Sequence, residues 1–319
     1  MKTMKNSSLH LLVLSCIFCI VSCNYDPKAG LKEETPTRGT IKIGVDESFY
    51  LLSEAHLYTF QAIYQNAHIT PLYKPELDIL NDFLHDSIRL MVTSRKLTTE
   101  EEEYFRGRNI FPRTVAIAYD GIAFIVNRKN KDSLIRFNAI KDIFLGKIDK
   151  WSKINPKNNI GDVKVVFDNI KSSNVRYLKE KFQIKDNFPK YCYAVDKNEE
   201  VLNYVEKNIN AIGVLSVNWI ADKDDSTTKG FLKRIRVVAV SSEVNSDAPD
   251  FYKPYPGFIA DQSYPFIRVI YMINRESFTG LASGYLQWAT ADQGQRIVLK
   301  MGMVPATMPI RLVKTKNSF

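Results

Sequence analysis

Thr40-Ile-Lys-Ile-Gly-Val45 is followed directly by Asp46-Glu47-Ser48 and then by an apolar run from Leu51 to Tyr64. The first segment alternates apolar residues with others, which predicts a β-strand. The second contains residue types that commonly cap helices, and the third has the spacing of a helix with one buried face. A strand that leads through a short polar loop into a helix is the repeating unit of α/β proteins. This stretch therefore predicts the fold class.

The same pattern recurs along the chain. We expect further strands over residues 68–73, 88–92, 111–118, 121–126, 163–167, 212–215, 235–240 and 267–273, and helices over 76–86, 98–105, 138–145, 175–182, 198–207, 280–289 and 293–301. Residues 241–262 are rich in Pro, Ser and Asp, so we expect them to be irregular. The prediction is an α/β protein with largely parallel sheets, and a length of 319 residues suggests roughly two domains.

The first residues have the features of a targeting segment. Lys2 and Lys5 precede a short apolar run over residues 9–21, which ends in Ile20-Val21-Ser22-Cys23. That ending resembles the bacterial lipobox, which implies a lipoprotein signal peptide over 1–22 and acylation of Cys23. Ordinary secretion, an uncleaved anchor and acylation at Cys16 are the alternatives. Residues 23–39 are polar and aperiodic, so we interpret them as a flexible tether on the periplasmic side of the cell envelope.

Composition and motifs exclude several function classes. The formal net charge is +9, but the basic residues are scattered and lack interleaved aromatic residues, so we expect no nucleic-acid partner. The chain has no GxGxxG, P-loop, GxSxG or HExxH motif, which argues against an enzyme, a cofactor or a metal. Cys192 is the one cysteine that remains after acylation of Cys23, and we interpret it as a small core residue.

Three strand ends carry polar clusters that each precede an expected helix. They are Asp46-Glu47-Ser48, Thr93-Ser94-Arg95 and Ser172-Ser173-Asn174. Ligands of α/β proteins lie beyond the carboxyl ends of strands, where free helix amides favour anions. Three such caps and one arginine would make a small oxyanion pocket. The alternative is that these residues are ordinary helix caps.

Four stretches together resemble the PstS-like phosphate-binding substrate-binding proteins of ABC transporters. Asp142-Ile-Phe-Leu-Gly-Lys-Ile-Asp-Lys-Trp151 and Gly294-Gln-Arg-Ile-Val-Leu-Lys-Met-Gly-Met-Val-Pro-Ala306 are the most specific. Val92-Thr-Ser-Arg-Lys-Leu97 and residues 117–127, which contain Asp-Gly-Ile-Ala, are the other two. They occur in the family's order between residues 40 and 306.

The resemblance implies a two-lobed periplasmic-binding-protein fold, type II-like, with two hinge crossings near residues 118–121 and 261–266. Lobe 1 would comprise residues 40–119 and 264–319, and lobe 2 residues 120–263. A monomeric, membrane-anchored receptor would capture inorganic phosphate, or a similar oxyanion, between the lobes and deliver it to an ABC transporter permease.

Carried over position by position, the resemblance implies a ligand-binding set. Its members are Ser48, Phe49, Thr93, Ser94, Arg95, Asp120, Ser172, Ser173, Asn174 and Arg176. The chain departs from the family at Asp46-Glu47, at Asp168 and at Asn174, where the family has Ser-Ser, an arginine in some members, and Thr. Two other hypotheses therefore stay open: a lipoprotein that acts as sensor or scaffold or binds another solute, and an extracytoplasmic phosphatase or hydrolase.

Overall fold

The computed structural model describes residues 34–221, 232–243 and 247–310. The expected signal peptide, Cys23 and most of the expected tether lie outside the described residues. Residues 35–319 form a unit separate from residues 1–34, and the fold described below belongs to that unit. Within the described ranges, every helix is too short or too polar to cross a bilayer.

The first half of the fold is a parallel sheet covered by helices on both faces. The central strand β1 (Gly39–Asp46) pairs in parallel with β2 (Ala67–Lys74) and with β3 (Leu90–Thr93). Four of its helices are α2 (Tyr50–Ile63), α3 (Glu76–Leu84), α12 (Leu281–Ala289) and α13 (Asp292–Lys300). A fifth, α4 (Thr99–Arg106), begins with the expected cap, in which Thr98 and Glu101 each accept the other's backbone amide.

The second half repeats this plan. Strand β6 (Lys164–Phe167) pairs in parallel with β7 (Cys192–Ala194) and β8 (Ala211–Ser216). Helices α5 (Phe137–Phe144), α7 (Ser173–Phe182) and α8 (Asn198–Lys207) pack on it.

The short elements of both halves are η1 (Glu47–Phe49), β5 (Leu134–Ile135), α6 (Trp151–Ile154), α9 (Asn218–Ala221), β9 (Ile235–Val237), β10 (Ala239–Ser241), β11 (Phe251–Tyr252), α11 (Pro256–Ala260) and β13 (Val304–Pro305).

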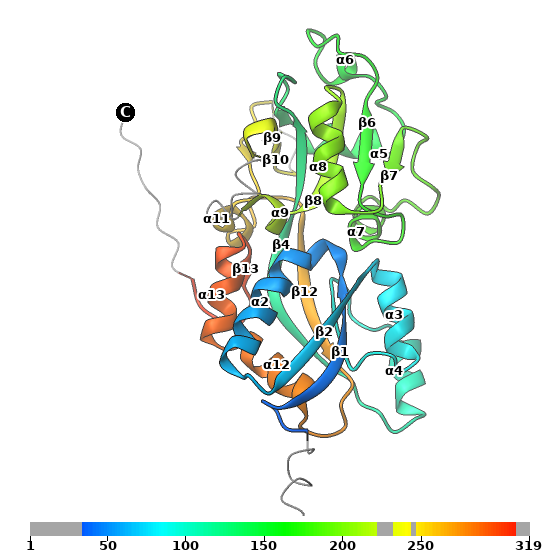
Figure 1. Cartoon of the computed structure of the whole chain (residues 1–319). Helices are drawn as coiled ribbons and strands as arrows, with labels where there is room; N and C mark the ends of the chain where they lie inside the picture. The colour runs from blue at the N-terminus through cyan, green and yellow to red at the C-terminus, as the bar shows by residue number, and fades with distance from the viewer. Residues whose placement is uncertain (1–33, 222–231, 244–246, 311–319) are drawn as a thin grey trace, which may run out of the picture. The chain divides into compact units, whose positions relative to one another are not determined.

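Two antiparallel strands join the halves (Figure 1). Strand β4 (Arg113–Asn127) pairs with β12 (Ile267–Asn274) as far as Gly121 and with β8 from Ile122 onward. The sheet order is β2-β1-β3-β12-β4-β8-β6-β7. The fold is thus the expected two-lobed α/β fold, in which parallel strands flank a central antiparallel pair.

Some expectations were wrong in detail. Residues 111–118 and 121–126 are not two strands but one, because Asp120 is paired across the sheet to Arg268 and the chain does not turn there. Residues 235–240 divide between β9 and β10, and residues 241–262 contain β11 and α11. Residues 35–39 pack on the body: β1 begins at Gly39, and the backbone of Pro36 lies against Gly284 of α12.

Candidate ligand-binding site

A buried ion pair lies where the two halves meet. Arg268 of β12 and Asp120 of β4 are opposite each other in the antiparallel register, so both side chains point to the same face of the sheet. The Arg268 Nε donates to Asp120 Oδ2 at 2.8 Å, while Asp120 Oδ1 accepts from Ser216 Oγ and from the Val217 amide. Burial raises the pKa of Asp120, although Arg268 opposes this. The pair therefore fixes a guanidinium in the interior.

The rest of the Arg268 guanidinium faces polar groups from both halves. Its Nη1 donates to Ser173 Oγ at 2.8 Å, and its central carbon lies 4.7 Å from the centre of the Phe49 ring. The Ser173 hydroxyl in turn donates to Ser48 Oγ at 3.4 Å. The Arg268 Nη2 is buried and has no protein partner. This is a cationic donor available to a bound group.

The loop between β6 and α7 is organised around Asp168. Ser172 Oγ and Asn174 Nδ2 donate to Asp168 Oδ1 at 2.8 and 3.1 Å, and Ser48 Oγ donates to Asp168 Oδ2 at 3.3 Å. Ser172 also caps α7 by accepting the Val175 amide. Burial raises the pKa of Asp168. Asp168 therefore ties the β1 and β6 strand ends together.

The first loop adds two more carboxyl groups. Asp46 Oδ1 accepts the Ser48 amide at 3.0 Å, and Oδ2 has no partner. The pKa of Asp46 is raised to about 7. Burial is the largest cause, and the negative charges of the nearby Glu76 and Asp168 add to it. Glu47 accepts from Asn198 at the start of α8, and burial raises its pKa to about 8. Both groups thus hold a proton more readily than an exposed carboxylate does.

A second cluster bridges the halves nearby. Arg176 of α7 contacts the Glu76 carboxylate and the Ser94 hydroxyl, and Thr93 Oγ1 donates to Glu76 at 2.6 Å. Arg95 does not join either cluster, since it pairs with Glu101 and donates to the Lys96 carbonyl.

The structure therefore brings together most of the residues expected from the sequence. Around Arg268 lie Ser48, Phe49, Asp120, Ser172, Ser173 and Asn174, and around Glu76 lie Thr93, Ser94 and Arg176.

Arg268 and Glu76 were not among the residues expected from the sequence. Arg268 is a single charge within the otherwise apolar strand Ile-Arg-Val-Ile-Tyr-Met-Ile, which is a usable signal. Glu76 gave no signal, because an acidic residue in the first turn of a helix is common.

Several buried polar atoms around Arg268 lack a protein partner. They are Asp46 Oδ2, Asn174 Oδ1, Asn198 Oδ1, Asn218 Oδ1 and Arg268 Nη2. Each unpaired buried group costs about 1–3 kcal/mol, so their concentration in one place points to a bound partner. Three amide oxygens, one carboxyl group and one charged donor suit a solute that carries both negative charge and protons, such as a protonated oxyanion. Within the described ranges, no three His, Cys, Asp or Glu side chains are grouped to hold a metal ion.

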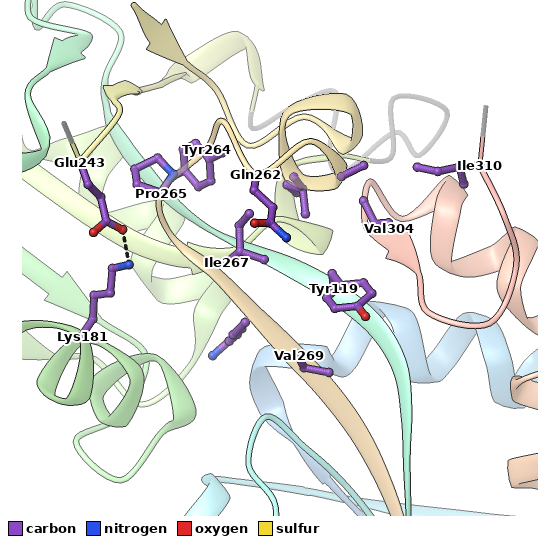
Figure 2. A pocket seen from close by; sticks show the side chains of 13 residues that line it. Tyr119, Lys181, Glu243, Gln262, Tyr264, Pro265, Ile267, Val269, Val304 and Ile310 are labelled. Carbon is purple, nitrogen blue, oxygen red and sulfur yellow. Dashed lines mark hydrogen bonds and ion pairs between the residues drawn. The ribbon is translucent and has the colours of Figure 1, made fainter. Parts of the chain in front are cut away.

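A cavity of about 620 Å³ shares Arg268 with this cluster. Figure 2 shows side chains that line the cavity. Tyr119 and Val269, which are opposite each other in the β4–β12 register, line it together with an ion pair between Lys181 and Glu243. Arg268 belongs to both places, but none of the ten expected ligand-binding residues lines this cavity. Of the residues named in the polar cluster, Arg268 alone lines the cavity.

Comparison with known proteins identifies the family. The sequence model of the PBP superfamily domain matches residues 31–293. The chain belongs to the PBP superfamily.

Among curated proteins, it is 24% identical over 199 residues to the phosphate-binding protein PstS of Staphylococcus saprophyticus, an alignment that covers 61% of this chain and 57% of that protein. The chain thus spans less than two thirds of the length of that relative.

Solved structures give the same fold. A Clostridium perfringens protein, described as a phosphate ABC transporter substrate-binding protein with bound phosphate, has a TM-score of 0.70 and 22% identity over 84% of this chain and 100% of that one. An ABC-type phosphate transport receptor of Vibrio cholerae has a TM-score of 0.62 and 14% identity, with the same coverage. At these identities the structures establish the two-lobed fold of this PBP superfamily member.

Proposed function

We propose that this protein is an extracytoplasmic solute-binding protein that captures inorganic phosphate between its two lobes and delivers it to an ABC transporter permease. The observation that carries the proposal is the Arg268 guanidinium, which holds an unused donor beside hydroxyl groups from both halves. A fixed guanidinium with hydroxyl donors is a common way to bind phosphate oxygens. The named functions of the relatives and neighbours favour the same ligand.

The proposal includes the arrangement expected from the sequence. Lobe 1 comprises residues 40–119 and 264–319, lobe 2 comprises residues 120–263, and β4 and the chain before β12 are the hinge crossings. The change of β4 from β12 to β8 at Gly121 and Ile122 supports a boundary there. A signal peptide over residues 1–22 and a lipid on Cys23 would hold a monomeric receptor near its permease and raise its effective concentration.

The acidic first loop favours one alternative. Together with Asp46 and Glu47, the clusters around Arg268 and Glu76 contain five carboxyl groups (Asp46, Glu47, Glu76, Asp120, Asp168) and two guanidinium groups (Arg176, Arg268). This excess suits a receptor or sensor for a solute other than phosphate. The protons favoured on Asp46 and Glu47 reduce the excess, and a protonated phosphate can donate to the remaining acceptors.

The test is titration calorimetry of the full chain with phosphate and with sulfate, on the wild type and on Arg268→Lys. A lysine keeps the charge but cannot bind Asp120, Ser173 and a ligand in three fixed directions. We expect phosphate binding in the wild type and a loss of at least tenfold in affinity in Arg268→Lys, since a hydrogen bond to a charged group contributes about 1.5–3 kcal/mol.

The matched control is Arg275→Lys, because Arg275 is also buried, also near a carboxylate and also stacked on an aromatic ring. It should bind phosphate as the wild type does. Absence of phosphate binding in the wild type, or equal binding by Arg268→Lys, would contradict the proposal and favour another solute.

A further inference from the structure

The Glu76 carboxylate is held in the way that a protein holds a bound anion. Its Oε1 accepts from Thr93 Oγ1 at 2.6 Å, from the Ser94 amide at 3.0 Å, and from Ser94 Oγ and Arg176 Nη2 at 3.3 Å. Its Oε2 is paired with Arg176 Nε. Glu76 is only 2% exposed, so water contributes little to its solvation. Arg176 lowers its pKa even though burial opposes this.

The donors are those of an oxyanion site, and they lie where such a site is expected. Two hydroxyls, one backbone amide and one guanidinium converge at the end of β3, beyond the carboxyl end of a parallel strand. The same atoms could bind a solute carboxylate, sulfate or phosphate. In this structure, a side chain of the protein itself uses them.

This contact also links the two halves. Glu76 begins α3 in the first half, whereas Arg176 belongs to α7 in the second half. Two further contacts reinforce the connection: the Leu77 amide donates to the Lys171 carbonyl at 3.4 Å, and Lys171 Nζ pairs with Asp78 at 2.9 Å. The first turn of α3 is thus fastened to the loop that begins α7.

We propose that Glu76 is an internal substitute for the anion: its carboxylate occupies an oxyanion subsite built by Thr93, Ser94 and Arg176, and holds the lobes together until an incoming oxyanion displaces it. The subsite deepens the proposed function and rests on it for the identity of the competing solute. A ligand that takes these donors must release Glu76, so the internal carboxylate lowers the affinity for external anions. If the ion pair were only structural, removing it would leave the affinity unchanged or lower it.

The experiment compares the full-length wild type with Glu76→Gln. Glutamine keeps the shape of the side chain but removes the charge and turns an NH₂ group toward donors, so it should leave the subsite. We expect the ligand-free variant to have a larger radius of gyration by small-angle X-ray scattering. We also expect its phosphate affinity in calorimetry to be at least tenfold higher, with phosphate restoring the compact form.

The matched control is Glu180→Gln, because Glu180 pairs with the same Arg176 from the solvent side and its side chain is 63% exposed. This variant should match the wild type in both measurements. A second variant, Glu76→Ala, makes room for a free carboxylate, so millimolar acetate should raise its melting temperature and leave that of the wild type unchanged.

The outcomes separate this inference from the proposed function. If neither wild type nor Glu76→Gln binds phosphate, the proposed function fails. The internal substitute is then judged by expansion of Glu76→Gln and acetate rescue of Glu76→Ala, and the absence of either overturns it. If the wild type binds phosphate and Glu76→Gln binds it equally or more weakly, Glu76 is a structural or ligand-contacting residue and the inference is wrong. A Glu76→Gln variant that stays compact without phosphate also overturns it.

Discussion

Asp46 shows how one carboxyl group can make the stability of this protein depend on pH. Its Oδ1 accepts the Ser48 amide, and its Oδ2 is buried without a partner. The pKa is raised from 3.8 to about 7 in the folded chain, chiefly by burial. In the unfolded chain the group ionises near pH 4, so the unfolded state binds fewer protons between pH 4 and 7. Asp46 therefore makes the free energy of unfolding fall as pH rises through this window.

Asp46→Asn should remove this dependence. The amide oxygen can still accept the Ser48 amide, while the buried charge is absent. We expect the variant to be more stable than the wild type by about 4 kcal/mol at pH 8 and by only about 1 kcal/mol at pH 4.5, measured by urea unfolding.

Asp261→Asn is the control, because Asp261 also accepts an amide two residues on, from Ser263 at 3.0 Å, but on the surface. Its stability should follow the wild-type curve at every pH. Equal stability of Asp46→Asn and wild type at pH 8 would show that Asp46 ionises in the folded protein without cost.

At the scale of strands and helices, local pattern predicted most elements but missed those set by distant contacts. Periodicity placed β1, α2 and α8 within a residue or two, because α2 and α8 each bury one face and the first residues of β1 alternate between buried and exposed. The expected strands left a break at Tyr119 and Asp120, yet β4 runs through both residues. Asp120 is satisfied there by Arg268, which lies 148 residues later in the sequence. The pattern of neighbouring residues therefore cannot predict that Asp120 has a partner within a continuous strand.

The site shows the same division. The hydroxyl clusters at strand ends were predictable because parallel strands end at one edge. Which arginine supplies the positive charge of the site was not predictable in this way. Arg95 lies in the expected loop but turns to Glu101, whose backbone is fixed by the cap of α4. Arg268 is delivered instead by the antiparallel strand β12, so its place depends on sheet order.

The packing of α8 on β8 depends on Gly213. A Cβ at this position would lie 2.8 Å from atoms of Ile125, Val201 and Val205. These branched side chains are fully buried, so they cannot all withdraw. We expect Gly213→Ala to lower the free energy of unfolding by about 1–3 kcal/mol in urea denaturation.

Gly257→Ala is the matched control on α11, since nothing lies within 4 Å of an added Cβ there. It should be neutral or stabilising by up to about 1 kcal/mol, because alanine is the better helix former. A neutral Gly213→Ala would show that the β8–α8 interface can shift to accept a methyl group.

For the molecule as a whole, the charge of the chain and the charge of the site have opposite signs. The chain carries a formal net charge of +9, which attracts anions at long range. The two clusters where the halves meet together hold more carboxyl than guanidinium groups. Two of those carboxyl groups, Asp46 and Glu47, have pKa values of about 7 and 8. Under the proposed function, an arriving anion meets a site whose charge depends on the pH of its surroundings.

This dependence predicts how phosphate affinity varies with pH. Below pH 6.5 both carboxyl groups are mostly protonated, and they can face an oxyanion without charge repulsion. As pH rises through 7 and 8 they lose their protons, and each new charge opposes the bound anion. Calorimetry should therefore show phosphate affinity falling by at least tenfold between pH 6 and pH 8.5.

Phosphate itself loses a proton in this range, so the contribution of the protein to the pH dependence of the affinity must be measured separately. Asp46→Asn retains Glu47 and should weaken the dependence, and a second change, Glu47→Gln, should weaken it further. If the double variant keeps the full wild-type slope, the ionisation of phosphate alone accounts for it. The two acidic residues of the first loop would then be no part of the ligand's surroundings, because a buried charge in contact with an anion must alter its affinity.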